Sequence, residues 1–437
     1  MSLRSRLEAY FEFESLGATW KTEILAGFTT FMTMAYIVFV NPAILHETGM
    51  PLAAVTAATC LSAALGSFLM GGFARYPIAL APGMGLNAYF TYTVVKGMGV
   101  AWPAALGAVF ISGVVFFLLT LVGVRQLIVS TIPTELYAAV AAGVGLFIAL
   151  VGFRNSGIVV SNPSTTVALG NLHDKSTALA LFGLLLIAAL LAWRVRAAML
   201  IGILATTALG LATGVAHWTP QAYRLSDLSA TAFKLDLAAT WRLGFLEIVF
   251  VFLFIDLFDN IGTLVAVGQK ANLFDQAHQI PRVNRILLSD ATATIVGSLS
   301  GTSTVVSYIE SAAGVAAGGR TGVTAMVTGL LFVGALFVAP VVGAIPAAAT
   351  APALIVVGSL MISSVAEIAW SDPEIAVPAF LTITLIPLTF SIANGLAFGF
   401  TAFTLLKVAR GKFRQVNWFV YLLTALFIAR FLYLSRG

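Results

Sequence analysis

The sequence predicts an all-α polytopic membrane protein with about fourteen transmembrane segments, which form two inverted seven-span repeats and include two short strand/half-helix segments. The first observation behind this prediction is composition. The 437 residues are 59% hydrophobic and only 9% charged, with a mean hydropathy of +0.99, whereas a soluble domain is about a quarter charged. The second is that apolar runs of about 20 residues, enough to cross a hydrocarbon core of ~30 Å, recur along the chain. The third is a faint similarity between its two halves.

Fourteen apolar runs give the expected spans. They cover residues 22–45, 51–73, 77–97, 101–123, 133–152, 177–193, 197–215, 244–268, 286–300, 302–317, 321–341, 344–366, 375–392 and 393–409. A further apolar stretch, 415–434, contains Arg430 and is flanked by basic residues, so it predicts either an interfacial helix or an extra span. Residues 1–21 are charged and amphipathic and lack the apolar core of a signal peptide, so we expect them to remain as a cytoplasmic segment.

The distribution of basic residues predicts the orientation. With the N-terminus in the cytoplasm, fifteen Lys and Arg side chains fall in cytoplasmic loops and six in outer loops. Cytoplasmic loops of membrane proteins are enriched in Lys and Arg. We therefore expect a multi-pass protein of the cell membrane with a cytoplasmic N-terminus. The net charge of +5 then needs no nucleic-acid partner.

Residues that could support metal binding or enzymatic chemistry are scarce. Cys60 is the single cysteine, and the histidines are scattered at His46, His173, His217 and His278. One cysteine forms no internal disulfide, and neither a metal-ligand spacing nor a nucleophile–base set occurs in the apolar runs. We expect no metal, no cofactor and no enzymatic activity, and we disfavour a channel.

Three matched features relate the two halves. The stretch "IPTELYAAVAAGVGLFIA" resembles "IPAAATAPALIVVGSLMI", with Ile-Pro at the start and Gly thirteen residues later. Glu23 and Glu247, each followed by Ile, begin the first spans of the halves 224 residues apart, and Asn87 and Glu310 are 223 apart. Because seven spans is an odd number, the halves insert with opposite topology. This arrangement is typical of transporters that hold their substrate near the bilayer midplane.

Two segments at corresponding places interrupt the helical pattern, Tyr76–Phe90 ("YPIALAPGMGLNAYF") and Gly301–Gly314 ("GTSTVVSYIESAAG"). Pro and Gly break the first, and β-branched residues favour a strand at the start of the second. We predict a strand and then a half-helix in each, with a strand at Thr302–Ser307 and half-helices that begin near Gly83 and Val306. Non-helical backbone at membrane depth is tolerated only inside protein or along a cavity. The two strands should therefore pair in the core, and the half-helices should direct free N–H groups at a central site.

Three carboxylates within the predicted spans are the candidate site acids. Asp256 and Asp259 share a helix face in "FLFIDLFDNIGTL", and Glu310 follows the second strand. A charged side chain at mid-bilayer costs about 2.5–3.5 kcal/mol, so these acids either face a wet cavity or are partly protonated. A structural role as hydrogen-bonding groups between helices is the competing interpretation.

Asn87 adds a group that both donates and accepts hydrogen bonds. Aromatic side chains stand near these four residues in the sequence: Tyr89, Phe90, Phe252, Phe258 and Tyr308. Acceptors combined with aromatic faces suit a flat heterocycle rich in N–H donors. Clustered acids would repel a simple inorganic anion.

Four segments in order carry a family resemblance: "AGFTTFMTMAYIVFVNPAIL", "APGMGLNAYF", "DLFDNIGTL" and "GTSTVVSYIESAAGV". Together they resemble the azaguanine-type purine permeases. These are the adenine/guanine/hypoxanthine branch of the nucleobase–cation symporters, which are related to the uracil and xanthine permeases. The resemblance extends from about Glu14 to Lys412. Uracil and xanthine relatives carry Glu-His where this chain has Asp259-Asn260, and this departure favours the purine branch.

The resemblance implies a fold like that of uracil permease and a homodimer formed through a gate domain. It also implies a division of the chain. The expected parts are a cytoplasmic segment at 1–21, a core domain at 22–125 and 241–341, a gate domain at 126–240 and 342–409, and a C-terminal basic and apolar segment at 410–437.

The function implied is import of purine nucleobases (guanine and hypoxanthine, with adenine as a further candidate) with H⁺ by alternating access. Na⁺ is the open alternative to H⁺. The alternatives on the same fold are a uracil/xanthine permease and an anion exchanger. The residues expected to bind the substrate are Asn87, Asp256, Asp259, Tyr308, Ile309 and Glu310. The three acids among them are expected to carry the coupling proton.

Overall fold

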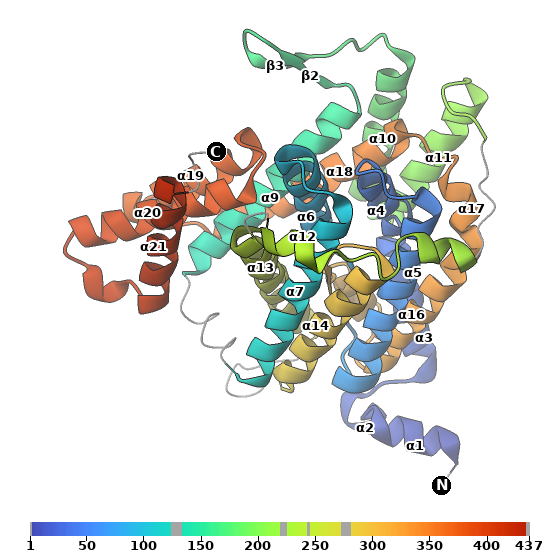
Figure 1. Cartoon of the computed structure of the whole chain (residues 1–437). Helices are drawn as coiled ribbons and strands as arrows, with labels where there is room; N and C mark the ends of the chain where they lie inside the picture. Colours follow the sequence, from blue (N-terminus) through green and yellow to red (C-terminus); the bar gives the residue numbers. More distant parts are fainter. Residues whose placement is uncertain (1, 124–132, 219–224, 243–244, 272–280, 434–437) are drawn as a thin grey trace. The chain divides into compact units, whose positions relative to one another are not determined.

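The computed structural model describes residues 2–123, 133–218, 225–242, 245–271 and 281–433. In these residues the regular secondary structure is helical apart from four short strands (Figure 1). Seven of the described helical stretches are long and apolar enough to cross a membrane, and shorter apolar helices accompany them. The predicted all-α polytopic membrane fold is confirmed.

The chain divides into two compact units. Unit 1 comprises residues 1–121 and 153–353, and unit 2 comprises residues 122–152 and 354–437. The predicted core and gate boundaries are not tested by this division and remain a prediction.

Unit 1 contains both discontinuous segments. Its helices before the first of them are α1 (Leu3–Tyr10), α2 (Phe13–Leu16), α3 (Trp20–Met34), α4 (Ile37–His46), α5 (Leu52–Leu69) and the π-helix η1 (Met70–Ala74). The first segment and its continuation are β1 (Leu80–Pro82), α6 (Met84–Ala88), the π-helix η2 (Tyr89–Gly97) and α7 (Trp102–Leu121).

The later part of unit 1 begins with a separate hairpin of β2 (Val159–Asn162) and β3 (Thr166–Leu169). It continues with α10 (Lys175–Ala192), α11 (Ala198–Ala212), η3 (Leu225–Ala230), α12 (Leu237–Arg242), α13 (Phe245–Ala271) and α14 (Val283–Ser300). The second discontinuous segment and the helices after it are β4 (Val305–Ser307), α15 (Ser311–Ala316), α16 (Gly322–Ala335), η4 (Leu336–Val338) and α17 (Ala339–Val342).

Side-chain caps start several of these helices. Thr19 and Thr22 form a reciprocal capping box at α3, and Asp174 accepts the backbone N–H groups of Ser176 and Thr177 at α10. Such caps satisfy N–H groups that have no partner inside the helix. The predicted spans at 22–45 and 177–193 begin within two residues of these helix starts.

A buried acid joins the starts of α3 and α16. Glu23 is fully buried, and its carboxylate accepts the backbone N–H groups of Arg320, Thr321 and Thr324 together with the Thr324 hydroxyl, at 2.6–3.3 Å. The free N–H groups at a helix start favour a negative charge. Glu23 therefore anchors the two helices to each other.

The two discontinuous segments pair as predicted. β1 and β4 are antiparallel, with Leu80 opposite Ser307 and Pro82 opposite Val305. All six strand residues are buried. The pairing extends past both ends of β4, because the Gly83 N–H donates to the Thr304 carbonyl at 2.9 Å and the Tyr308 N–H donates to the Ala79 carbonyl at 3.0 Å.

Polar side chains of neighbouring helices satisfy the other backbone groups of the strand pair. The Ser67 hydroxyl accepts the Leu80 N–H at 3.0 Å, and the Thr294 hydroxyl donates to the Val305 carbonyl at 2.9 Å. The Ser311 hydroxyl accepts the Ala79 N–H at 3.0 Å. Buried backbone groups need such partners, which explains why short polar residues line α5 and α14 at this depth.

Two details of the prediction were wrong. The second strand covers only Val305–Ser307, so Thr302–Thr304 lie outside it. The second half-helix begins at Ser311 instead of near Val306. The extra pairing of Tyr308 with β1 keeps the backbone extended there, which delays the helix. The first half-helix begins at Met84 with Gly83 as its N-cap, as expected.

Helices are the regular secondary structure of unit 2 in the described residues. α9 (Thr134–Asn155) and α18 (Ala347–Met361) run across the division, and η5 (Ile362–Glu367), α19 (Pro373–Leu388), α20 (Ile392–Ala409), η6 (Phe413–Gln415) and α21 (Trp418–Tyr433) follow. The 415–434 stretch therefore contains a helix, and the Thr424 and Thr404 hydroxyls bond at 2.7 Å to hold it on α20.

Candidate functional site

Asn87 lies in the half-helix α6, one turn after β1. Its side chain is fully buried, and its Oδ1 accepts a short hydrogen bond from the Ser303 hydroxyl, just before β4. Its Nδ2 is buried and has no hydrogen-bond partner within the described residues. Asn87 thus links the two discontinuous segments.

Asp256 belongs to a buried network that sequence reasoning did not anticipate. Its Oδ1 accepts a hydrogen bond at 2.9 Å from Nδ2 of Asn260 in the same helix, α13. The same amide makes a short contact with Oδ2 of Asp290 in α14. All three side chains are fully buried. One amide therefore bridges two carboxylates from neighbouring helices.

Asp290 ties this network to β4. Its Oδ1 accepts the Ser307 N–H at 3.1 Å and lies 3.4 Å from the Ser307 hydroxyl. The Oδ1 of Asn260 lies 3.3 Å from the same N–H. The strand that precedes Tyr308 and Glu310 is thus positioned by side chains of α13 and α14.

Glu310 is the N-cap residue of α15. It is half-buried, and its Oε1 accepts a hydrogen bond from the Tyr36 hydroxyl at 2.8 Å. Tyr36 sits between α3 and α4, where the first span is interrupted. The carboxylate is therefore oriented by a residue 274 positions away in the sequence.

Tyr308 crosses the strand pair. Its hydroxyl donates to the Pro82 carbonyl at 2.6 Å, and its ring is almost fully buried. The phenol lies within electrostatic range of the carboxyl groups of Glu310 and Asp259. Asp259 is half-buried, whereas Ile309 is largely exposed. α13 also packs against α15 and β4, so Asp259 of the eighth segment and Glu310 of the tenth lie near Tyr308.

The aromatic residues expected near the site pack on one another. Phe252 of α13 contacts Tyr89 edge-on at 5.0 Å between ring centroids, and it lies 6.5 Å from Phe90. All three are fully buried. The side chain of Phe258 lies outside the described part of the structure. These rings join α13 to the start of η2 and do not form an open face.

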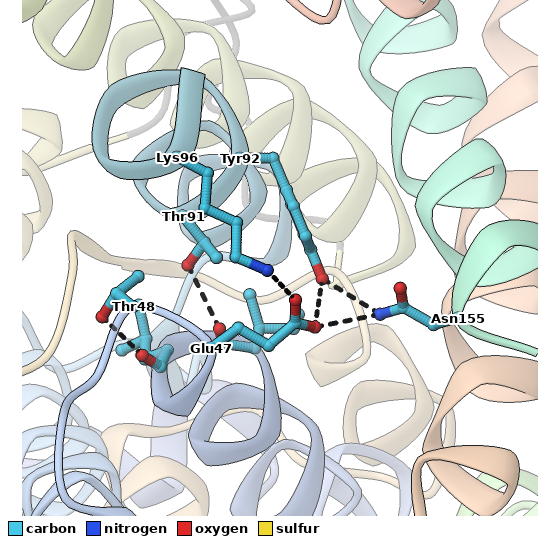
Figure 2. Close-up of polar contacts among 8 residues, drawn as sticks. Glu47, Thr48, Thr91, Tyr92, Lys96 and Asn155 are labelled. Atoms are coloured by element: carbon cyan, nitrogen blue, oxygen red, sulfur yellow. Dashed lines mark hydrogen bonds and ion pairs between the residues drawn. The ribbon is translucent and has the colours of Figure 1, made fainter. Parts of the chain in front are cut away.

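The far end of η2 is fixed by a second polar cluster (Figure 2). Glu47, the C-cap of α4, forms an ion pair with Lys96 and accepts the Tyr92 hydroxyl at 2.6 Å. Nδ2 of Asn155 donates to Glu47 Oε1 at 3.1 Å and to the Tyr92 hydroxyl at 3.0 Å. The half-helix α6, which carries Asn87, continues directly into η2, and this continuous helix is thus anchored at both ends.

Sequence reasoning missed four residues of this region: Tyr36, Asn260, Asp290 and Ser303. A signal existed only for Asp290, an acid within the predicted span 286–300, to which the reasoning applied to Asp256 also applies. The roles of the others depend on contacts across the fold.

A hollow of about 500 Å³ lies elsewhere in unit 1, between α10 and α11. Its lining residues are Lys175, Ala178, Leu179, Phe182, Leu209, Thr213 and Val215. None of the predicted substrate residues belongs to it. We therefore keep the predicted residues, and not this surface hollow, as the candidate site.

The fold and site define a class of protein: a polytopic membrane transporter with two discontinuous segments that pair in its core. The chain belongs to the permease family described by the Xan_ur_permease model, which matches residues 21–430.

Several relatives are similar over nearly their whole length. A putative permease of Methanocaldococcus jannaschii is 51% identical over 98% of this chain and 99% of its own length. The guanine/hypoxanthine permease PbuG of Bacillus subtilis is 44% identical over 98% and 100%, and the adenine permease AdeP of Escherichia coli is 42% identical over 98% and 96%. The resemblance predicted from the four motifs is confirmed, and the relatives are transporters, not enzymes.

Solved structures show the same fold at low sequence identity. The transmembrane domain of the cyanobacterial bicarbonate transporter BicA matches with a TM-score of 0.61 at 15% identity, covering 86% of this chain and 97% of that domain. SLC26A9 matches with a TM-score of 0.63 at 11% identity, covering 94% and 69%. At this identity the likeness concerns the fold alone.

Proposed function

We propose that this protein imports purine nucleobases with H⁺ by an alternating-access mechanism. The observation that supports the proposal is that Asn87, Tyr308 and Glu310 lie on or directly after two discontinuous segments that pair with each other, and that Asp259 of α13 lies near Tyr308. The names of the relatives, adenine permease and guanine/hypoxanthine permease, support the purine class.

Each predicted residue receives a role that its surroundings support. Glu310 and Asp259 are half-buried, and they accept N–H groups of the base. Asn87 offers its Nδ2 to a ring nitrogen or an exocyclic oxygen. The exposed Ile309 packs on the flat face of the base. Tyr308, whose hydroxyl is held by the Pro82 carbonyl, closes the side of the site.

The coupling proton is carried within the set Asp256, Asp259 and Glu310. These carboxylates lie in or beside apolar helices, where an extra negative charge is expensive. Loading a proton reduces that charge and lets the site cross the bilayer with its substrate. The Asn260 amide donates to both Asp256 and Asp290, so a proton taken up by Asp256 reduces the negative charge that this pair places in the core.

Alternating access is proposed to move the core parts, residues 22–125 and 241–341, against the gate parts, residues 126–240 and 342–409. We further propose a homodimer in the cell membrane with the N-terminus in the cytoplasm. The excess of basic residues in the loops on that side supports this orientation.

Two alternative substrates are disfavoured by the same residues. An anion such as bicarbonate would meet the carboxylates of Glu310 and Asp259. Uracil and xanthine relatives carry Glu-His where this chain has Asp259-Asn260, and here the asparagine bridges two buried aspartates.

Uptake of labelled hypoxanthine, guanine and adenine into vesicles with an imposed pH gradient tests the proposal. We expect saturable uptake that collapses with a protonophore and in Glu310→Gln. Uracil, xanthine and bicarbonate should compete poorly. Uptake that is unchanged both by the protonophore and by Glu310→Gln would contradict the proton-coupled mechanism.

A further inference from the structure

A charged cluster joins the N-terminal segment to two helix ends of unit 1. Glu12 lies between α1 and α2, and its Oε1 pairs with Nη1 of Arg75 at 3.3 Å and with Nη1 of Arg282 at 3.1 Å. Arg75 is the C-cap of η1, and Arg282 is the N-cap of α14. One carboxylate oxygen therefore holds two guanidinium groups from distant parts of the chain.

All three residues adopt left-handed backbone conformations. The φ angles are 59° at Glu12, 64° at Arg75 and 57° at Arg282. Residues with a Cβ rarely adopt this conformation unless the surrounding contacts impose it. Seven non-glycine residues in the described chain have a positive φ, and three of them meet at this single oxygen. Three uncommon backbone conformations thus coincide at this cluster.

The segment that carries Glu12 is itself firmly attached. The Tyr10 hydroxyl donates to the Gly72 carbonyl at 2.6 Å, and Arg75 donates to the Tyr10 carbonyl at 2.8 Å. Phe11 and Phe13 are buried against α16. In Figure 1 this segment lies beside the end of unit 1 at which α3 begins. Glu12 is therefore presented by an ordered element and does not come from a free tail.

The two helix ends lead directly to the paired strands. Arg75 is followed by the extended stretch that enters β1, and the Tyr76 hydroxyl bonds to the Pro281 carbonyl next to Arg282. α14 carries Asp290 and Thr294, both bonded to the backbone of β4. A change in the distance between the end of η1 and the start of α14 would therefore change how β1 and β4 pair.

We propose that Glu12 is a positioning residue for the substrate site and that the N-terminal segment acts as a charge clamp on these two helix ends. Without the carboxylate, Arg75 and Arg282 face each other as like charges, and the helix ends move apart. This displacement reaches the substrate through β1 and β4, because the Glu12 carboxylate pairs with the two arginines and not with a predicted substrate residue. The effect on purine affinity rests on the proposed function, whereas the clamp itself does not.

A set of four proteins tests the clamp: wild type, Glu12→Gln, Arg282→Gln and the double variant, all purified at full length. Binding of labelled hypoxanthine is measured in low salt and in 1 M KCl. We expect Glu12→Gln to weaken binding about fivefold or more. Arg282→Gln removes one of the like charges. Both the Arg282→Gln variant and the double variant should therefore bind hypoxanthine much as wild type does. Glu14→Gln, an exposed acid on the same segment, is the matched control.

Salt distinguishes repulsion from a general loss of structure. At 1 M the Debye length falls to about 3 Å, so KCl should restore much of the affinity of Glu12→Gln. The midpoint of thermal unfolding gives a readout that needs no substrate. Glu12→Gln should unfold at a lower temperature than wild type in low salt, and the gap should close in 1 M KCl.

The outcomes separate the two proposals. A wild-type protein that binds no purine contradicts the proposed function, and the unfolding midpoints still decide the clamp. Normal purine binding and stability in Glu12→Gln overturn the clamp, as does a defect that Arg282→Gln does not repair. If Glu12→Gln fails to fold, a folded double variant supports the clamp and an unfolded one overturns it.

Discussion

The hydroxyl of Tyr308 donates a hydrogen bond to the carbonyl oxygen of Pro82 at 2.6 Å. This bond connects the residue after β4 with the last residue of β1, so the Tyr308 side chain spans the antiparallel strand pair, whose two ends lead to α6 and to α15. Proline has no N–H to donate, and its carbonyl remains a strong acceptor. The pair therefore couples the predicted substrate residue Tyr308 to the geometry of the first discontinuous segment.

Replacing Tyr308 with Phe tests this coupling. The change leaves the buried Pro82 carbonyl without its donor, which destabilises the fold by about 1–3 kcal/mol. We expect a lower unfolding midpoint and weaker purine binding. Tyr421→Phe removes an exposed hydroxyl-to-carbonyl bond of similar length in unit 2 and serves as the control. Equal effects on purine binding in the two variants would count against a role for the Tyr308 bond in the site.

Asp290 offers a second prediction. Asp290→Ala removes the nearer acceptor of the Ser307 N–H and leaves it with Asn260 Oδ1 at 3.3 Å, and the loss of this buried charged acceptor costs about 1–3 kcal/mol. Asp290→Asn keeps an oxygen for that N–H but loses the charge beside Asn260. We expect Asp290→Ala to abolish purine binding and Asp290→Asn to retain part of it. Binding isotherms and unfolding midpoints measured side by side provide the check, and identical behaviour of the two variants would show that the acceptor is unimportant.

The fold was largely predictable because its signals are local. Apolar runs mark the spans, and Pro82 with Gly83 marks where α6 begins. The start of α15 was misplaced because nothing within "VSYIESAAG" shows that the Tyr308 N–H pairs with Ala79. That pairing joins residues more than 220 positions apart, and it overrides the local preference for a helix.

The site was predictable to the extent that burial of charge is unusual. Asp256 and Glu310 stood out as acids in apolar surroundings, and the structure adds the partners that orient them. Those partners, Tyr36 and Asn260, are ordinary residues in sequence, and their roles arise only from tertiary proximity. Asp290, also an acid within an apolar span, could have been predicted by the reasoning that singled out Asp256.

Close packing between α15 and α3 gives a third prediction. A Cβ on Gly314 would lie 2.7 Å from the Ala26 carbonyl oxygen and would also overlap the Thr30 hydroxyl. Gly314→Ala should therefore destabilise the protein by about 1–3 kcal/mol and displace Glu310 at the start of α15. A Cβ on Gly72 meets no atom within 4 Å, so Gly72→Ala is the control. Retention of wild-type uptake and unfolding midpoint by Gly314→Ala would contradict this packing.

The last prediction concerns Glu374, in the first turn of α19 and one residue before the predicted span 375–392. Its carboxylate pairs with Lys407 at 2.7 Å, Arg410 at 2.8 Å and Lys412 at 2.7 Å. Hydrogen bonds from Lys407 and Lys412 lower the pKa of Glu374 to about 2.

A carboxyl group whose pKa is lower in the folded state stabilises the protein above its unfolded pKa. That contribution is lost as pH falls from about 4.5 toward 2. Glu374→Gln leaves three cations together, so the variant should unfold at a lower temperature at pH 7. Its deficit relative to wild type should shrink as the pH is lowered through this window. Unfolding midpoints of both proteins between pH 7 and pH 3 give the measurement, and a deficit that stays constant with pH would contradict an electrostatic role for Glu374.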